Sequence, residues 1–436
     1  MIIQTHGIGG SQDLPISPIL AIAGAVAALT ISFTVLAVAW RKPRYSESVG
    51  DPAPRWLARL VDSAGWAIAL RVLGLLLFGY LLWVTYLGPD LLTNPAFGMF
   101  YVLLWVGLVP VSLAFGPVWK AISPTRTISR GVARLARTDP ETGLVGYRVR
   151  LGYWPAALGL FAFVWTELVS PRPDELGTIQ LWIGVYLAVM LVGGALGGQQ
   201  FHEHVDPFEV YSTLVSRMSF WGRRHGELVV RSPMANLAMT PVRPGLVAVV
   251  AVLFGSTAFD SFKDSPEWLS VTQSSSSPYL LNNLALIGFC LAVGAIFAAG
   301  TMATGVGPET RRRDLPGLFA HSVAPIVIGY VVAHYLSFLV IVGQTTLIQM
   351  SDPMGNGSNL LGTADWSVNY WLLEHPTLLA NTKVLAVVTG HILGVIAAHD
   401  RAISLLPKRH QLTGQLPLLF AMVAFTVGGL YLLFAS

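Results

Sequence analysis

The chain has 436 residues, of which 53% are hydrophobic and 11% charged, and its formal net charge is +4. Soluble domains carry about 25% charged residues, so this composition and a mean hydropathy of +0.61 exclude an ordinary soluble protein and indicate a polytopic membrane protein. The single cysteine, Cys290, excludes a disulfide framework and a cysteine-based metal site within one chain.

Apolar segments long enough to span a bilayer recur along the whole chain. A helix needs about 20 apolar residues to cross the hydrocarbon core. We therefore predict an all-α fold, a polytopic transmembrane helical bundle that forms one integral membrane domain over residues 1–436. The ten predicted spans are 16–40, 66–87, 96–118, 153–169, 178–198, 246–262, 280–302, 318–348, 378–398 and 416–434.

The basic residues alternate between the loops of this prediction. Counted along the sequence, 23 of the 27 Lys and Arg residues lie in loops that follow odd-numbered spans. Because basic loops are retained in the cytoplasm, we predict a multi-pass protein of the cell membrane with both termini extracytoplasmic. The positive charge then reflects topology, and no nucleic-acid partner is expected. Residues 1–13 lack the basic start of a cleavable signal peptide, so we expect the first span to serve as the insertion signal.

The loop after the fifth predicted span contains DPFEVYSTLVSRM at 206–218. Asp206 suits an N-cap and Pro207 suits the first helical position, and apolar side chains then recur on one helical face. We predict a short amphipathic helix at the inner membrane interface, with Arg217, Arg223 and Arg224 near lipid headgroups.

Two histidines in the eighth predicted span point to a functional position, because histidine is costly in hydrocarbon. His321 and His334 lie 13 residues apart, which is about 220° around an ideal helix, so they cannot share one ligand. His334 falls in the predicted outer half, with Tyr330 on the same helical face. One interpretation is that each histidine hydrogen-bonds a neighbouring helix. The other is that His334 is a metal ligand or a proton carrier.

Carboxyl groups gather in the same predicted outer half. Glu167 ends the fourth span and Asp260 ends the sixth. Carboxylate and imidazole together suit a divalent metal with an open position for an activated water. The candidate catalytic residues are His334, Asp260, Glu167 and Tyr330, and the candidate metal ligands are His334, Asp260, Glu167 and His6. The alternative is that these carboxylates are only solvated helix ends and that His6 is an inert tail residue.

A haem site is the weaker alternative. Two histidines on facing helices at similar depth would be needed, and only His321 paired with His391 or His399 could meet that condition. The chain contains no phosphate-binding loop, no G-x-S-x-G and no H-E-x-x-H.

Seven segments, which together extend over nearly the whole chain, resemble one protein family. They are HGIGG at 6–10, GPVWKAISPTRTI at 116–128, DPFEVYSTLVSRM at 206–218, GSTAFDSF at 255–262, FAHSVAPIVIGYVVAHY at 319–335, GTADWSVNYWLL at 362–373 and TGHILGVIAAHDRA at 389–402. The chain resembles bacterial, largely actinobacterial, integral membrane proteins labelled fenitrothion hydrolase or conserved membrane protein. The resemblance implies hydrolysis of an aryl organophosphorothioate with release of a phenol, but it transfers no catalytic residues.

Three functions follow as hypotheses. One is a membrane hydrolase of apolar phosphotriesters that uses a metal-activated hydroxide. The others are a transporter or metal-handling protein, and a haem-binding redox or respiratory assembly factor. The expected partners are the lipid bilayer and a small apolar substrate.

Overall fold

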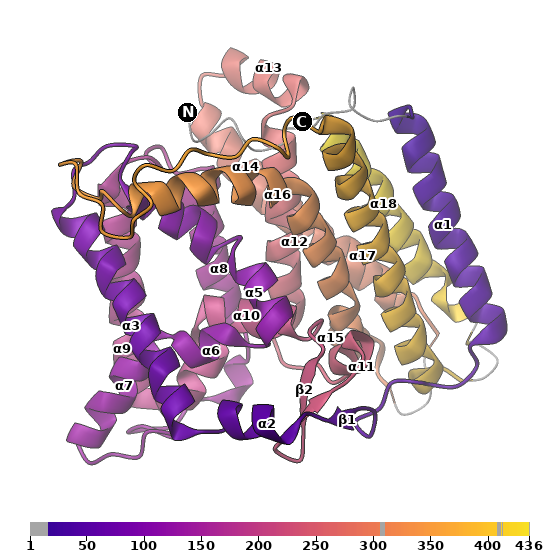
Figure 1. The fold of residues 1–436 in the computed structure, drawn as a ribbon. Helices are drawn as coiled ribbons and strands as arrows, with labels where there is room; N and C mark the ends of the chain where they lie inside the picture. The colour runs from indigo at the N-terminus through magenta and orange to yellow at the C-terminus, as the bar shows by residue number, and fades with distance from the viewer. Residues whose placement is uncertain (1–15, 306–309, 408–410, 412, 436) are drawn as a thin grey trace.

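The computed structural model describes residues 16–305, 310–407, 411 and 413–435. Within them, helices long and apolar enough to cross a membrane dominate the fold, and eight satisfy both criteria. They are α1 (Pro18–Ala39), α3 (Ala64–Leu87), α9 (Leu176–Val205), α12 (Leu246–Lys263), α14 (Pro278–Met302), α16 (Ala324–Gln349), α17 (Pro376–Leu405) and α18 (Leu416–Ala435). The predicted all-α, multi-pass bundle is confirmed (Figure 1).

The third and fourth predicted spans take less regular forms. The third consists of α4 (Pro95–Phe97), the π-helix η3 (Gly98–Leu104) and α5 (Leu108–Phe115), with a bend of 44° between η3 and α5. The fourth is α8 (Trp154–Leu168), whose 15 residues rise about 22 Å, less than the roughly 30 Å of the hydrocarbon core. These two segments line the interior near the candidate site.

Shorter elements complete the fold. The helices are α2 (Arg55–Val61), α6 (Val118–Ile122), α7 (Pro124–Leu135), α10 (Pro207–Ser216), α11 (Pro233–Ala238), α13 (Pro266–Ser274) and α15 (Leu315–Phe319). Four 3-10 turns lie between helices. They are η4 (Val149–Leu151) before α8, η5 (Arg312–Asp314) before α15, η6 (Ala320–Val323) before α16 and η8 (Thr413–Gln415) before α18. The strands β1 (Asp51–Pro52), β2 (Trp221–Arg224) and β3 (Glu227–Val230) form one antiparallel sheet in the order β1-β3-β2.

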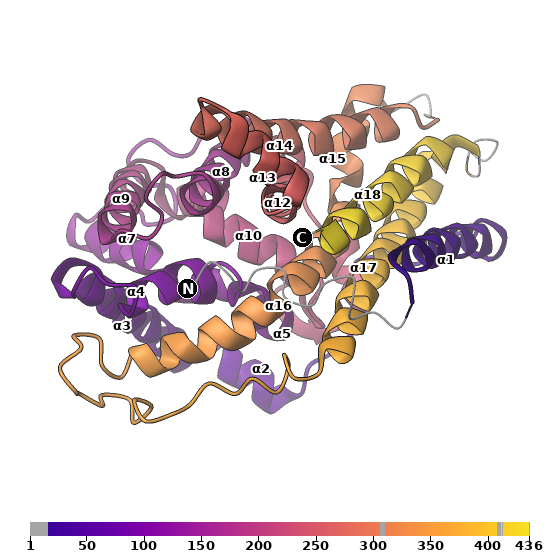
Figure 2. The ribbon, with the colours of Figure 1, turned by 90° about the horizontal axis from the view of Figure 1, so that it is seen from above.

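The bundle has a buried centre and a lipid-like periphery. In α12, 78% of the apolar window is buried, and in the stretch that ends with α16 the value is 72%. In α1, α3 and α14 it is only 28%, 17% and 28%, so these helices present apolar side chains outward, as in a bilayer. Figure 2 shows α10 and α12 surrounded by the other helices.

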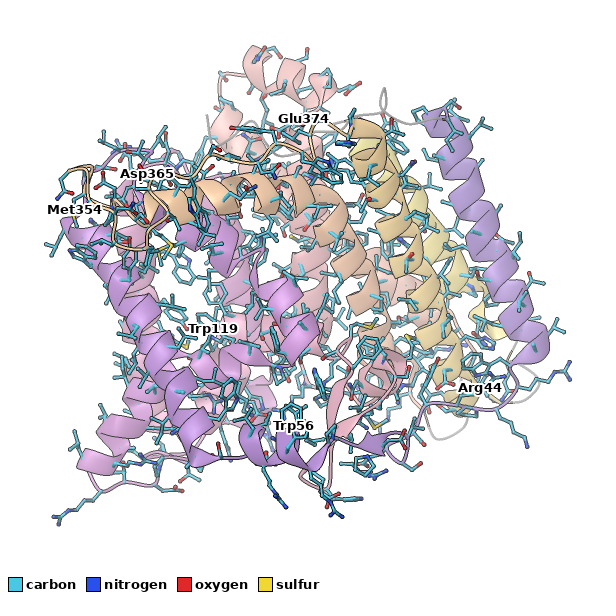
Figure 3. The ribbon with its side chains drawn as sticks, viewed as in Figure 1. Arg44, Trp56, Trp119, Met354, Asp365 and Glu374 are labelled. Carbon is cyan, nitrogen blue, oxygen red and sulfur yellow. The ribbon has the colours of Figure 1, made fainter. Side chains whose placement is uncertain are left out.

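The two ends of the bundle carry different loops. Figure 1 shows that α1 begins and α18 ends at the same end. Figure 3 places Arg44 and Trp56 at one end, and Met354, Asp365 and Glu374 at the other. This arrangement agrees with an even number of crossings, while the orientation of the termini relative to the cytoplasm stays a prediction.

The structure corrects one expectation about the inner interface and leaves another as a prediction. The helix predicted after Asp206 is present as α10, but nine of its ten residues are buried, so it lies inside the bundle and not on a lipid surface. Arg223 and Arg224 lie in β2 and contact protein groups: Arg223 Nη2 is 2.6 Å from Asp62 Oδ1, and Arg224 donates to the carbonyl oxygens of Ser48 and Gly50. The position of Arg217, Arg223 and Arg224 near lipid headgroups stays a prediction.

Candidate functional site

The structure brings Asp260 of α12 into direct contact with two neighbouring side chains of α16. His334 Nε2 lies 2.8 Å from Asp260 Oδ2, and the Tyr335 hydroxyl donates to the same oxygen at 2.7 Å. Asp260, His334 and Tyr335 are at most 2% exposed. A carboxylate buried to this degree is stabilised only by charge-assisted hydrogen bonds or an ion pair.

The ion pair comes from the same helix. Lys263, three residues after Asp260, places its Nζ 3.0 Å from Asp260 Oδ1, and its side chain is 20% exposed. Residues three apart lie on one helical face, so a single turn of α12 supplies both the carboxylate and its countercharge. Lys263 therefore links the buried pair to the end of the bundle at which α12 ends.

Ser261 completes a chain of hydrogen bonds through the imidazole. Its Oγ lies 3.1 Å from His334 Nδ1 and 3.3 Å from the carbonyl oxygen of Thr257. Because an ionised carboxylate only accepts hydrogen bonds, the neutral ring donates from Nε2 to Asp260 and accepts the Ser261 hydroxyl at Nδ1. When Nδ1 takes up a proton, Ser261 can turn, accept from Nδ1 and donate to Thr257. The imidazole can thus gain and lose a proton without an unpaired polar group.

Glu167 lies near this group without joining it. Both carboxyl oxygens are buried and lack a hydrogen-bond partner among the described residues, although the group is within electrostatic range of Asp260 and Lys263. A buried polar group without a partner costs about 1–3 kcal/mol. The buried position of Glu167 therefore costs free energy, and apolar packing alone does not explain why a carboxyl group is present there.

The structure brings two of the predicted site residues into contact and places a third elsewhere, while their predicted roles stay predictions. Asp260 and His334 are in contact, as their shared depth suggested, and Glu167 is close by. Tyr330 is not part of the group: its ring packs against Phe254 at 5.4 Å, and its hydroxyl lacks a hydrogen-bond partner among the described residues. Tyr330 also faces α12, but it meets Phe254, six residues before Asp260, whereas Tyr335 reaches the Asp260 carboxylate.

Sequence reasoning missed Ser261, Lys263 and Tyr335. Each is adjacent to a predicted residue or one helical turn away from it. The available signal was the run DSFK at 260–263, in which an acid and a base three apart end an apolar helix.

No family model, curated protein or solved structure matches this chain. The resemblance to the fenitrothion hydrolase family consequently rests on the seven segments quoted above, and the roles of residues rest on their contacts.

The contacts do not build a metal centre in the described part of the chain. No group of three or more His, Cys, Asp or Glu side chains there lies close enough together to hold a metal ion. A cation already contacts Asp260, namely the Lys263 ammonium group. His6 lies outside the described residues, and its role as a ligand stays a prediction.

The three haem candidates have different surroundings. His399 contacts Gln415 Oε1 through Nδ1 and the carbonyl oxygen of Trp40 through Nε2, so it has no nitrogen left for iron. His391 donates from Nδ1 to the Val387 carbonyl within its own helix. His321 lines a cavity of about 70 Å³, whereas pockets for drug-sized ligands measure roughly 300–1,000 Å³. These contacts do not favour a haem.

Proposed function

We propose that this protein is a proton-coupled membrane transporter in which the Asp260–His334 pair binds the proton. The observation that supports the proposal is the direct contact of a carboxylate, an imidazole and an ammonium group inside a bundle of membrane-length helices. Ionisable residues at such positions are expensive, and proton relays are one of the functions that retain them. Imidazole also changes its charge near physiological pH more readily than other side chains.

The contacts suggest how binding is coupled to movement. A proton at His334 Nδ1 makes the ring a cation, which then shares Asp260 with Lys263. Two cations compete for one carboxylate, so protonation weakens the attraction between Asp260 and Lys263. Lys263 is the most exposed of the three, and its release would change how the end of α12 packs.

Charge movement on a solid-supported membrane tests the proposal. A rapid pH jump applied to reconstituted protein should give a transient current from proton binding, and the displaced charge should fall by at least about half in Asp260→Asn and in His334→Gln. Tyr330→Phe is the matched control, because it removes a buried hydroxyl of α16 that lies outside the group. A wild-type signal no larger than that of protein-free membranes would refute the proposal.

A hydrolase is the second candidate, and one specific observation favours it. Ser261, His334 and Asp260 form a hydroxyl–imidazole–carboxylate chain, the arrangement that activates a serine nucleophile in unrelated hydrolases. Ser261 is 1% exposed, so a substrate would reach it only after the helices separate. This route uses no metal, unlike the metal-assisted route expected from the sequence.

Phenol release separates the two hydrolytic routes. Purified protein would be incubated with an aryl phosphorothioate triester, in EDTA and again with added Zn²⁺ or Mn²⁺. Phenol release in EDTA that is lost in Ser261→Ala would support the serine route. Release only with metal would support the metal-assisted route, and no release in either condition would contradict hydrolysis of this substrate class.

A further inference from the structure

A second buried polar cluster explains why α10 lies inside the bundle. Arg126 of α7 donates from Nε and Nη2 to the two carboxyl oxygens of Glu209 on α10, at 2.9 and 2.6 Å. It also donates from Nη1 to Gln199 Oε1 at 2.9 Å. Arg126 and Glu209 are 3% and 1% exposed. A buried ion pair gives little net stability over an apolar pair of similar size, so a positioning role accounts better for its presence.

Further contacts hold the start of α10. Asp206 Oδ1 accepts the backbone N–H groups of Phe208 and Glu209, and its Oδ2 accepts Trp119 Nε1 and the Tyr186 hydroxyl, both at 2.9 Å. With its first turn held in this way, α10 packs between α8 and α16, which carry Glu167 and the Asp260 partner His334. Figure 2 shows α10 at the centre of the bundle.

The buried position of α10 brings Tyr211 close to Glu167. Tyr211 is 1% exposed, its ring lies 4.9 Å from that of Trp105, and its hydroxyl lacks a hydrogen-bond partner in the described part of the chain. Trp105 also packs at 5.0 Å against Phe163, which lies four residues before Glu167 on α8. Two buried polar groups in electrostatic range, both unpartnered, would be satisfied by one bridging water. The neighbouring backbone is the π-helix η3, a form frequent at functional sites.

Glu167 has the surroundings of a neutral acid. Among the described residues no cation contacts its oxygens directly, and the Asp260 carboxylate is nearby. An isolated carboxylate is far more costly to bury than a carboxylic acid. When a proton leaves Glu167, a water held by Tyr211 can accept it and pass it on, so that the group gives up and regains one proton per cycle.

We propose that Glu167 is a second proton-binding carboxyl group, served by a water site at Tyr211, so that each chain binds two protons. This inference rests on the proposed proton-coupled function. The bound species is a proton that is delivered and removed through water. Helix α10 positions the Tyr211 hydroxyl, which holds that water.

Infrared difference spectroscopy of the wild-type protein tests the protonated state directly. A buried carboxylic acid gives a C=O stretching band that shifts in deuterium oxide. Once the contribution of Glu209 has been identified with Glu209→Gln, the remaining band should be present at neutral pH in wild type and in Asp260→Asn, shifted in Tyr211→Phe, and absent in Glu167→Gln. Tyr330→Phe, which removes an equally buried hydroxyl elsewhere, should leave it unchanged. A band that persists in Glu167→Gln would overturn the assignment.

The displaced charge then counts the protons. In the pH-jump measurement, Glu167→Gln and Asp260→Asn should each displace about half the wild-type charge, and the double variant almost none. Wild-type-sized charge in Glu167→Gln would overturn the second site but leave the proton-coupled function intact. The absence of any wild-type signal would instead refute the proposed function.

Discussion

Removing the Arg126 side chain tests whether the buried ion pair holds α10 in the bundle. Arg126→Ala leaves Glu209, which is 1% exposed, without its countercharge. Loss of one partner of a buried pair costs about 3–5 kcal/mol. Arg172→Ala is the matched control, because the pair between Arg172 and Glu175 spans 3.5 Å and its side chains are 70% and 50% exposed. A pair of that kind contributes roughly 0–1 kcal/mol.

The penalty should depend on pH in a defined direction. Burial raises the pKa of Glu209 to about 7, although the ion pair with Arg126 opposes the shift. A carboxyl group whose folded pKa is raised contributes stability below its unfolded pKa of about 4.5, and this contribution is lost as the pH rises through the folded pKa. Removal of Arg126 raises the folded pKa further. The cost of Arg126→Ala should therefore be small near pH 5 and complete near pH 8.

The assay is the free energy of unfolding in bicelles, measured by steric trapping at both pH values. The double variant Arg126→Met with Glu209→Leu should recover most of the loss at pH 8, because a neutral apolar pair leaves no buried charge. The reasoning is refuted by an Arg126→Ala penalty no larger than that of Arg172→Ala, or by one that is equal at pH 5 and pH 8.

Two further pairs of variants test close packing and the candidate site by the same assay. A Cβ at Gly74 would collide with the backbone of α6, whereas one at Gly79 of the same helix would meet no atom within 4 Å, so Gly74→Ala should cost about 1–3 kcal/mol and Gly79→Ala less than about 1 kcal/mol. Equal costs would contradict the α3–α6 contact. Tyr335→Phe removes the hydrogen bond to the Asp260 carboxylate and should cost about 1.5–3 kcal/mol, whereas Tyr330→Phe should be neutral or stabilising. A destabilised Tyr330→Phe would show that its hydroxyl has a partner.

The sequence predicted the lengths of the apolar segments and the positions of ionisable residues that are costly to bury within them. A membrane span needs a minimum number of apolar residues, so composition along the chain predicts the multi-pass bundle without knowledge of any contact. The same cost of burying charge marked Asp260, His334 and Glu167 as candidates, and the structure places these three near one another.

Which helices face one another was decided only by the tertiary structure. Polar residues of α10 indicated a solvent-facing side, but Glu209 and Ser212 meet Arg126 and Ser112 from distant parts of the chain. Likewise, spacing within α16 favoured Tyr330 as the neighbour of His334, whereas the packing of α16 against α12 selects Tyr335. Periodicity describes one helix at a time, while a buried polar group is stabilised by partners from other helices. The sequence by itself determined the membrane spans and the ionisable residues that are costly to bury. The packing of the helices determined which of these residues meet in the site.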